Sequence, residues 1–485
     1  MLYSPGCQSA SETRIRARFS TGSAIQYRKG SFMVNIFRKL RRSEPSTTAA
    51  SKGPAQETSP VVESGKPRTL FIGHTRFSVH QHGSGYFNAT RDADAGAGFT
   101  EDEYTSWLYS ETRLAPRTEI FTTLSLPQLA LAARDHDVVH FVSYSPSLPA
   151  HHQQALKEAA QKHPFLRLNE TTKPVNSTPS RKLVEQALAE RDLGSRPFGV
   201  YRLDDDDLLS VRYFDQMAPY VTPRHVGWWV SLGTGFSAIR VDGKYAYTRE
   251  LYYPKSAFGP MAIAAVDQDG EIENLSAPKH TVMDKFNPTI LDSREPAYFH
   301  IRHESQDSTV KGSIAPFYPE AMSRILGEGP ADLTQAAELF PVLDGLAAHE
   351  PGAPESGVTL SAAPLSLSRE AVTFDWPHEG PLSLVLIPAE GGRVNSNQVQ
   401  VRLTVTETSE DEETSKFFAQ GRFRHSERDG TYWTYMPHKT SGFGHVLPIE
   451  PPKGVSVSKI TLITSRKDQV DLDSVTAYPL PARRV

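Results

Sequence analysis

Short apolar runs alternate with helix-like segments between residues 69 and 202, a pattern typical of an α/β domain. The helix-like segments carry apolar side chains on one face, whereas the runs are short and continuously apolar, as buried strands are. In chain order the pattern predicts a strand at 69–73, a helix at 126–133, a strand at 137–144, helices at 150–163 and 181–191, and a strand at 198–202. Short links in this order predict a parallel sheet between helices, with 198–202 as its third or fourth strand.

The chain beyond residue 202 turns to β-structure. Residues 224–230 and 237–240 read as strands, and Asp242-Gly243 is a good hairpin turn. Residues 343–364 are rich in Ala, Gly, Pro and Glu, which indicates a linker.

Strands separated by turns, with little helical periodicity, follow this linker. The pattern predicts strands at 371–376, 382–387, 398–406, 416–425, 432–436, 459–465 and 475–479. An antiparallel β-sandwich of about 120 residues is expected. The predicted division is a tail at 1–66, an α/β domain at 67–342, a linker at 343–368 and the sandwich at 369–485.

Composition narrows the class of protein. With 52 Lys and Arg against 56 Asp and Glu, the 485-residue chain lacks the charge excess of a nucleic-acid binder. Cys7 is the single cysteine, which excludes an intrachain disulfide framework and a multi-cysteine zinc site. No apolar stretch approaches the roughly 18 residues of a membrane span. The predicted localisation is cytoplasmic, with the inner face of the cell membrane as the alternative.

The first 66 residues form a segment of different composition. Residues 1–42 hold nine Lys or Arg and one acidic residue, and 43–66 are rich in Ser, Thr, Pro and Ala. Such a segment has too little apolar area to offset chain entropy, so we expect it to be disordered. A basic amphipathic stretch from Met33 favours peripheral contact with an anionic membrane. The alternative is that translation starts at Met33. A secretory signal is not expected, because no apolar core follows the early basic residues.

Four consecutive aspartates at 204–207, called the Asp run below, directly follow the predicted strand 198–202. Ligands of open α/β sheets bind at the carboxyl ends of the strands, where such side chains gather. Carboxylates there suit Mg²⁺ or Mn²⁺, which take oxygen ligands and often substrate phosphates. The alternatives are a solvated acidic turn and an adventitious Ca²⁺ site.

Three segments resemble a known family. Thr-Arg-Phe-Ser-Val at 75–79, Phe-Thr-Thr-Leu-Ser-Leu-Pro-Gln at 121–128 and Tyr-Arg-Leu at 201–203 are similar to the bacterial putative rhamnosyltransferases, over roughly residues 68–320. The resemblance implies a GT-A-type glycosyltransferase: a Rossmann-like mixed sheet with flanking helices, carrying the metal-binding DXD motif. It also implies a nucleotide-sugar donor.

The same resemblance implies roles within the Asp run. Asp204 would approach the ribose or the water shell of the metal, Asp206 would bind the metal, and Asp205 would occupy the variable position beside the nucleotide-sugar. Asp207 would orient its neighbours. Alternate residues of an extended segment share a face, which gives a similar division of labour.

A histidine from a later strand is the expected third metal ligand, and His303 in the strand-like stretch 298–304 is the residue that the resemblance implies. His300 and His303 lie three apart, so a strand would direct them to opposite faces, and only one is expected to reach the metal. A plain surface role for His303 is the alternative.

Residues on both sides of the Asp run complete the predicted binding site. Thr75 and Arg76, after the first strand, are expected to contact the nucleotide, because an arginine can pair with phosphate in a bidentate manner. Arg202 is expected at the nucleotide-sugar or as a counter-charge to the Asp run. The acceptor is assigned to the following set: Trp229, Gly233, Thr234 and Gly235.

Two carboxylates are candidates for the catalytic base. An inverting transfer needs one carboxylate within hydrogen-bond reach of the acceptor hydroxyl. Asp284 is favoured over Glu250 because it lies nearer to His303 in the sequence, and either residue has a surface role as its alternative.

The leading interpretation is a metal-dependent hexosyltransferase that moves a sugar, rhamnose by the family's name, onto a glycan or glycolipid in cell-surface polysaccharide synthesis. An inactive glycan-binding or assembly protein on a transferase-like fold is the second interpretation, and a metal-dependent phosphoesterase the third. The sandwich would bind glycan or mediate oligomerisation. The sequence does not determine the oligomeric state. Its candidate stacking residues are Trp376, Tyr432, Trp433 and Tyr435, although alternation would place half of them in the core.

Overall fold

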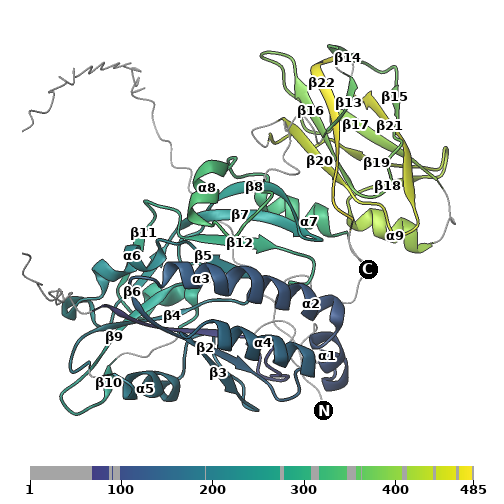
Figure 1. Ribbon diagram of the computed structural model, residues 1–485. Coiled ribbons are helices and arrows are strands. Elements are labelled where there is room, and N and C mark those ends of the chain that lie inside the picture. Colours follow the sequence, from purple (N-terminus) through teal and green to yellow (C-terminus); the bar gives the residue numbers. More distant parts are fainter. Residues whose placement is uncertain are drawn as a thin grey trace, which may run out of the picture. The chain divides into compact units, whose positions relative to one another are not determined.

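The computed structural model describes residues 68–86, 90, 99–191, 193–273, 278–306, 316–346, 357–361, 363–406, 412–440, 444–465 and 469–482 (Figure 1). Residues 65–485 form one compact unit. The predicted tail, with the amphipathic stretch at Met33, lies outside the described residues.

A mixed eight-stranded sheet forms the centre of the first half (Figure 1). Its order is β11 (Thr289–Asp292), β6 (Trp229–Leu232), β9 (Met261–Val266), β4 (Phe198–Arg202), β1 (Leu70–Arg76), β2 (Asp137–Tyr144) and β3 (Leu166–Glu170), with β10 (Ile272–Glu273) on β9. β1 to β4 are parallel, as the sequence predicts. β9 is antiparallel to β4 and β6, so the sheet is mixed.

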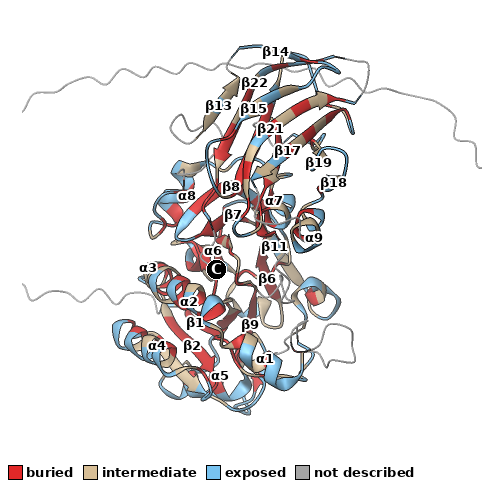
Figure 2. Cartoon of the chain, turned by 90° about the vertical axis from the view of Figure 1, so that its right-hand side faces the viewer, coloured by how far each residue is buried: buried red, intermediate tan, exposed pale blue. Residues whose placement is uncertain are grey.

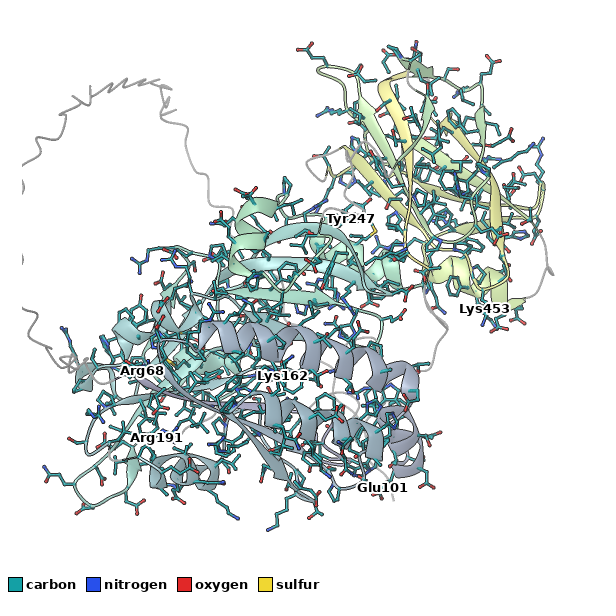
Figure 3. All side chains as sticks on the ribbon, viewed as in Figure 1. Arg68, Glu101, Lys162, Arg191, Tyr247 and Lys453 are labelled. Carbon is teal, nitrogen blue, oxygen red and sulfur yellow. The ribbon has the colours of Figure 1, made fainter. Side chains whose placement is uncertain are left out.

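Helices cover both faces of this sheet. α5 (Arg181–Ala189) packs on one face against Leu70 and Ile72, and Phe71 points to the other face. That second face carries α6 (Tyr213–Met217), and α4 (Ala150–Lys162) packs over β2 and β3. Figure 2 shows the strands largely buried and the helices exposed on their outer sides. Arg191, labelled in Figure 3, forms a bidentate ion pair with Asp137 at the start of β2.

A continuous helical segment runs beside the sheet, called the long helix below. It consists of α2 (Glu111–Glu119), a π-helical stretch (Ile120–Ser125) and α3 (Leu126–Ala132), and α1 (Glu101–Leu108) precedes it. The sequence predicted only its last part, from residue 126. Two of the residues that α2 buries are Arg113 and Arg117, so apolar periodicity could not reveal it.

A second sheet of four strands lies after the Asp run. Its order is β5 (Asp207–Leu209), β12 (Tyr298–Arg302), β7 (Thr234–Val241) and β8 (Lys244–Tyr252). Asp242 and Gly243 both have positive φ, 48° and 74°, which confirms the predicted hairpin turn. α8 (Leu333–Leu339) covers this sheet. Short 3₁₀ turns occupy Ala218–Tyr220, Pro223–His225 and His280–Lys285, so the predicted strand 224–230 begins only at Trp229.

The carboxyl-terminal part consists of two antiparallel five-stranded sheets around one core, consistent with the predicted sandwich. One sheet is β13 (Val358–Ser361), β22 (Val470–Pro479), β16 (Leu382–Pro388) and β20 (His445–Ile449), with β14 (Leu365–Leu367) on β22. The other is β15 (Val372–Asp375), β21 (Ser456–Thr464), β17 (Val399–Thr406), β19 (Thr431–Tyr435) and β18 (Arg424–Ser426).

Two details of this part differ from the sequence prediction. The predicted strand 416–425 is mostly helix α9 (Glu412–Gln420), because the adjacent Phe417 and Phe418 are both buried, as neighbours on a helix can be and neighbours on a half-buried strand are not. β13 and β14 lie inside the predicted linker 343–368 and pair with β22. Before the sandwich, α7 (Phe317–Ile325) packs against residues of β16, β20 and β22. Among the described residues, no helix combines the length and hydropathy of a membrane span.

Candidate active site

The Asp run connects the two sheets of the first half. β4 ends at Arg202, and β5 begins at Asp207, which pairs with β12. The hydroxyl of Thr75 donates to the carbonyl of Leu203 at 2.7 Å, and the N–H of Asp207 lies 3.4 Å from the carbonyl of Asp204. The run is therefore a turn rather than an extended segment, and the expected sharing of one face by alternate residues does not apply.

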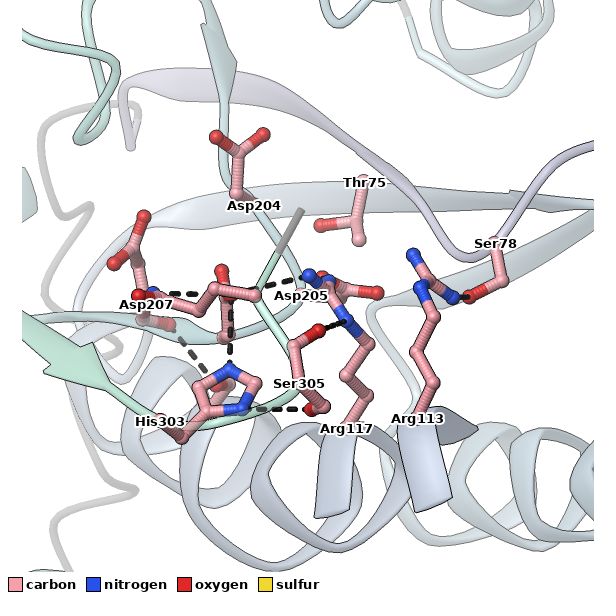
Figure 4. Close-up of polar contacts among 12 residues, drawn as sticks. Thr75, Ser78, Arg113, Arg117, Asp204, Asp205, Asp207, His303 and Ser305 are labelled. Atoms are coloured by element: carbon pink, nitrogen blue, oxygen red, sulfur yellow. Dashed lines mark hydrogen bonds and ion pairs between the residues drawn. The ribbon is translucent and has the colours of Figure 1, made fainter. Parts of the chain in front are cut away.

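Arg117 of the long helix balances the charge of the run (Figure 4). Its guanidinium forms an ion pair with Asp205, and its Nη2 lies 3.6 Å from Asp206 Oδ2. Both carboxylates are buried. Burial by itself would raise the pKa of Asp206, but the charge of Arg117 and the hydrogen bond from His303 outweigh it and hold that pKa below its usual range.

Both histidines of the 298–304 stretch contact the run. His303 Nε2 lies 3.1 Å from Asp206 Oδ2, and its Nδ1 lies 2.8 Å from the hydroxyl of Ser305 (Figure 4). His300 Nδ1 lies 2.7 Å from Asp207 Oδ1. The expectation that only one histidine points to this side was wrong in its geometry, because β12 ends at Arg302 and strand alternation does not extend to His303.

Burial shapes the protonation of the His300–Asp207 pair. It lowers the pKa of His300 to about 3, so the imidazole is neutral near pH 7. It raises the pKa of Asp207 well above its ordinary value, and the neighbouring carboxylates of Asp206 and Asp204 raise it further. One proton shared by this pair therefore keeps Asp207 from adding a third buried carboxylate charge to those of Asp205 and Asp206.

Arginines surround the Asp run in a cleft of about 340 Å³, called the Asp cleft below. Its lining includes the four aspartates and His300, Phe258, Gln306, Arg76, Arg113, Arg117, Arg302 and Arg324. Arg113 donates to the hydroxyl of Ser78 at 2.9 Å, and Ser78 itself has a positive φ of 45°. A serine in this conformation is uncommon and often marks a functional site.

Arg302 lines the Asp cleft with one nitrogen of its guanidinium unpaired among the described residues. Its Nε is buried, and among the residues that the structure describes no hydrogen-bond partner reaches that atom. Burial, followed by the nearby charge of Arg324, lowers the pKa of Arg302 to about 10. Arg324 forms an ion pair with Glu320 at 2.6 Å. The buried Nε has no described hydrogen-bond partner, although the charge of Asp207 acts on the guanidinium, and it favours an anionic ligand in this cleft.

The predicted nucleotide contacts divide into cleft and support residues. Arg76 lines the Asp cleft, whereas Thr75 is buried and hydrogen-bonded to His140 and Leu203. Arg202 binds Asp204 through its Nη2, 2.7 Å from Oδ2. Thr75 thus supports the Asp run through its hydrogen bond to Leu203. Arg202 acts as a counter-charge to the run, which was one of its two predicted roles.

The predicted acceptor residues lie elsewhere. Trp229 is 2% exposed in the hydrophobic core, so its ring cannot stack on a sugar in this structure, and that prediction was wrong. Gly235 is required for packing, because a Cβ there would lie 2.4 Å from Tyr298, and a Cβ on Gly233 would lie 2.3 Å from Ser293 Oγ. Thr234 donates to the carbonyl of Ser293 at 2.9 Å.

Neither predicted base is among the described residues that line the Asp cleft. Asp284 is exposed and pairs with Lys255 at 2.8 Å, and this hydrogen bond lowers its pKa. Glu250 is exposed on β8. The predictions of Asp284 and Glu250 as bases gain no support from their positions.

Sequence reasoning predicted Arg76 and missed the other arginines of the cleft. Arg113 and Arg117 are four residues apart, a spacing that places both on one face of a helix, and Arg302 follows His300 by two, the spacing of one strand face. These spacings were the available signal. The buried polar face of α2 concealed it, because apolar periodicity was the criterion.

The residues present fit a divalent cation in part. Asp206 Oδ2 and His303 Nε2 are 3.1 Å apart, about the separation of neighbouring ligands around an octahedral ion with bonds of ~2.1 Å. Asp204 is held by Arg202. Over the described ranges, three such ligand atoms within 4.8 Å of one another occur at Glu111, His151 and His152 and not at the Asp run. A cation at the run would therefore need phosphate oxygens or water to complete its shell.

The candidate stacking residues of the sandwich are divided as alternation predicts. Trp376 and Tyr432 belong to its core. Trp433 and Tyr435 are partly exposed, and Trp433 lies opposite Arg402 and Arg424 in the sheet.

Comparison with known proteins finds a family match for the first half of the chain. A family model described as "Putative rhamnosyl transferase" matches residues 71–313, just over half of the chain. No curated protein matches it. A crystal structure of HddC from Yersinia pseudotuberculosis aligns with 48% of this chain and 90% of that chain, at 7% identity and a TM-score of 0.20, a likeness that carries no argument.

Proposed function

Because the chain belongs to the putative rhamnosyl transferase family, we propose that it transfers a sugar, rhamnose by the family's description, from a nucleotide-sugar donor to a carbohydrate acceptor. The reaction would take place in the Asp cleft, on a domain of GT-A type. The alternating strands and helices and the acidic turn after β4 support this fold assignment.

The observation that carries the proposal is Arg302 beside the Asp run, whose buried Nε has no hydrogen-bond partner among the described residues. A nucleoside diphosphate is an anion that would satisfy this arginine and reach Arg76 and Arg113 in the same cleft. Positive side chains together with a bridging cation would allow a phosphate group to approach the aspartates.

Asp206 and His303 would hold Mn²⁺ or Mg²⁺ together with the donor phosphates. When bound, the cation would supply Lewis-acid neutralisation of the diphosphate leaving group. Arg117 lowers the pKa of Asp206 and forms an ion pair with Asp205, which fixes the position of that carboxylate. Arg302 and Arg113 would orient the diphosphate so that the sugar carbon faces the acceptor.

An assay of donor cleavage tests the proposal. The full chain is incubated with rhamnose and hexose donors carried on UDP, dTDP or GDP, with Mn²⁺ or EDTA, and release of the nucleoside diphosphate is measured. We expect release from one donor that EDTA abolishes and that Asp206→Asn lowers by at least about 100-fold. Asp215→Asn, an exposed aspartate of α6 outside the cleft, serves as the matched control.

The inactive glycan-binding interpretation predicts the opposite result. It would be favoured if no donor turned over with a panel of glycan acceptors present and calorimetry detected neither Mn²⁺ nor nucleotide binding. Binding of Mn²⁺ and one nucleoside diphosphate that requires Asp206 would support the transferase even before an acceptor is found.

A further inference from the structure

A cluster of metal-ligating side chains lies outside the Asp cleft, where α2 and α4 contact each other (Figure 1). Glu111 is the first residue of α2, and His151 and His152 belong to the first turn of α4. His151 Nε2 lies 2.9 Å and His152 Nε2 lies 3.4 Å from the same oxygen, Glu111 Oε1. The ligand atoms of all three residues lie within 4.8 Å of one another.

His152 is oriented for this position. Its side chain is only 4% exposed, and its Nδ1 lies 2.7 Å from the hydroxyl of Thr118, a second residue of α2. Its Nε2 is buried without a hydrogen-bond partner among the described residues and faces Glu111. When Nδ1 donates its proton to Thr118, the lone pair of Nε2 points at the carboxylate of Glu111, and a cation between the two would bind both.

The exposure of the cluster suits a metal as well. His151 and Glu111 are each 62% exposed, which leaves the remaining coordination positions open to water. Two imidazole nitrogens and one carboxylate oxygen, with an open position, form a ligand set typical of zinc. The Nδ1 contact with Thr118 is the outer hydrogen bond that ligating histidines usually make.

We propose that Glu111, His151 and His152 bind a divalent transition-metal ion of the Zn²⁺ class, at a site separate from the Asp cleft. The ion would join the first turns of α2 and α4. Because α2 also carries Arg113 and Arg117, the site would stabilise the helix that supplies the Asp cleft with its positive charge.

Zinc titration calorimetry on the EDTA-treated full chain tests this inference without reference to activity. We expect wild type to bind one more Zn²⁺ than Glu111→Gln, and His151→Ala to weaken that site by at least about tenfold. Thr118→Val is expected to weaken it by roughly 10- to 100-fold through loss of the outer hydrogen bond. Zn²⁺ should also raise the melting temperature of wild type more than that of Glu111→Gln.

Two control variants isolate the site. Asp206→Asn removes the main carboxylate of the proposed site in the Asp cleft and should leave binding at Glu111 unchanged. His378→Ala removes an exposed histidine of the sandwich and should have no effect. Equal zinc stoichiometry and affinity in wild type and Glu111→Gln would overturn the proposal. Glu111→Gln and His151→Ala alter exposed side chains, so both variants are expected to fold. Circular dichroism verifies this.

Discussion

At the scale of single residues, Arg302 has a feature that lowers the stability of the folded chain and that an anionic ligand would relieve. Its Nε is buried without a partner among the described residues, and its pKa is lowered to about 10 by burial. A buried N–H without a partner lowers the stability of the folded chain, and an anionic ligand would satisfy it. Ser78, which accepts a hydrogen bond from Arg113, has an unfavourable positive φ at the same cleft.

Replacing Arg302 by Met should therefore separate stability from binding. We expect Arg302→Met to be at least as stable as wild type and to bind the donor's nucleoside diphosphate roughly 10- to 100-fold more weakly, as loss of a charged hydrogen bond implies. Thermal melts and titration calorimetry measure the two effects. Arg212→Met, an exposed arginine outside the cleft, is the control. A destabilised variant with unchanged nucleotide affinity would assign Arg302 a structural role.

Two buried histidines behind the Asp run carry a second residue-scale consequence. Thr75 donates its hydroxyl proton to Leu203, so His140 Nε2 must donate to Thr75, and His140 Nδ1 accepts from Tyr201. Burial lowers the pKa of His140 to about 3 and that of His74 to about 4. Both rings are neutral in the native state, while in the unfolded chain they take up protons near pH 6.5.

Stability should consequently fall with acid in a defined window. A group with a lowered native pKa stabilises fully above its unfolded pKa, so its contribution is lost as the pH drops from about 6.5 to about 4 for His74. The loss from His74 amounts to roughly 3 kcal/mol. Urea unfolding at pH 7, 5.5 and 4 measures it. His74→Gln should flatten the pH dependence and His378→Gln should not, and equal slopes in all three proteins would contradict the assignment.

At the scale of elements, the long helix organises the candidate site. Arg117 pairs with Asp205 and Asp206, the hydroxyl of Ser125 donates to the carbonyl of Asp207 at 2.9 Å, and Gln128 donates to the carbonyl of Leu339. The π-helical stretch between Arg117 and Ser125 adds a residue to the helix and changes which side chains face the run. The segment 121–128, which carries part of the family resemblance, is thus the support of the Asp run.

Removing the charge of Arg117 tests this support. Arg117→Met would leave two buried carboxylates uncompensated, and we expect the free energy of unfolding to fall by about 3–5 kcal/mol. Millimolar Mn²⁺ should restore part of the loss in the variant and stabilise wild type less, because the cation replaces the missing charge.

Urea unfolding with and without Mn²⁺ measures the effect. In the double variant with Asp206→Asn the Mn²⁺ effect should shrink, since one carboxylate no longer binds the ion. An Arg117→Met protein as stable as wild type would show that the ion pair only balances its own desolvation.

At the scale of the whole molecule, helix α7 connects the half that contains the Asp cleft with the sandwich. Pro316 provides no side-chain cap for α7, and Glu450 of the sandwich instead accepts the backbone N–H of Tyr318 at 2.7 Å. The hydroxyl of Tyr318 donates to the carbonyl of Pro481 at 2.7 Å. Tyr318 and Met322 share one hydrophobic cluster with Val385 and Tyr478.

These contacts predict cooperative unfolding of the two halves. Glu450→Ala should lower the free energy of unfolding by about 1–3 kcal/mol, because it leaves a buried N–H at the helix start unsatisfied. Calorimetry should show one main transition in wild type that shifts downward in the variant. Two independent transitions in wild type, with only one affected by the substitution, would contradict this coupling.

The sequence by itself determined the elements that local pattern controls. β2 and β4 occupy the predicted residues, α4 and α5 differ only at their ends, and the Asp242–Gly243 turn forms as expected, because apolar runs, helical periodicity and turn residues act over a few neighbouring positions. The family resemblance, carried by short segments, likewise led to the family that matches residues 71–313.

Tertiary structure alone decided which side chains meet. Arg117 lies 88 residues from Asp205, and His303 lies 97 residues from Asp206, so no local pattern could pair them. The same long-range packing placed Trp229 in the core and turned the Asp run back on itself. It also joined Glu111 to His151 and His152. Charge compensation in a buried site depends on distance in space, and the chain's order along the sequence does not encode that distance directly.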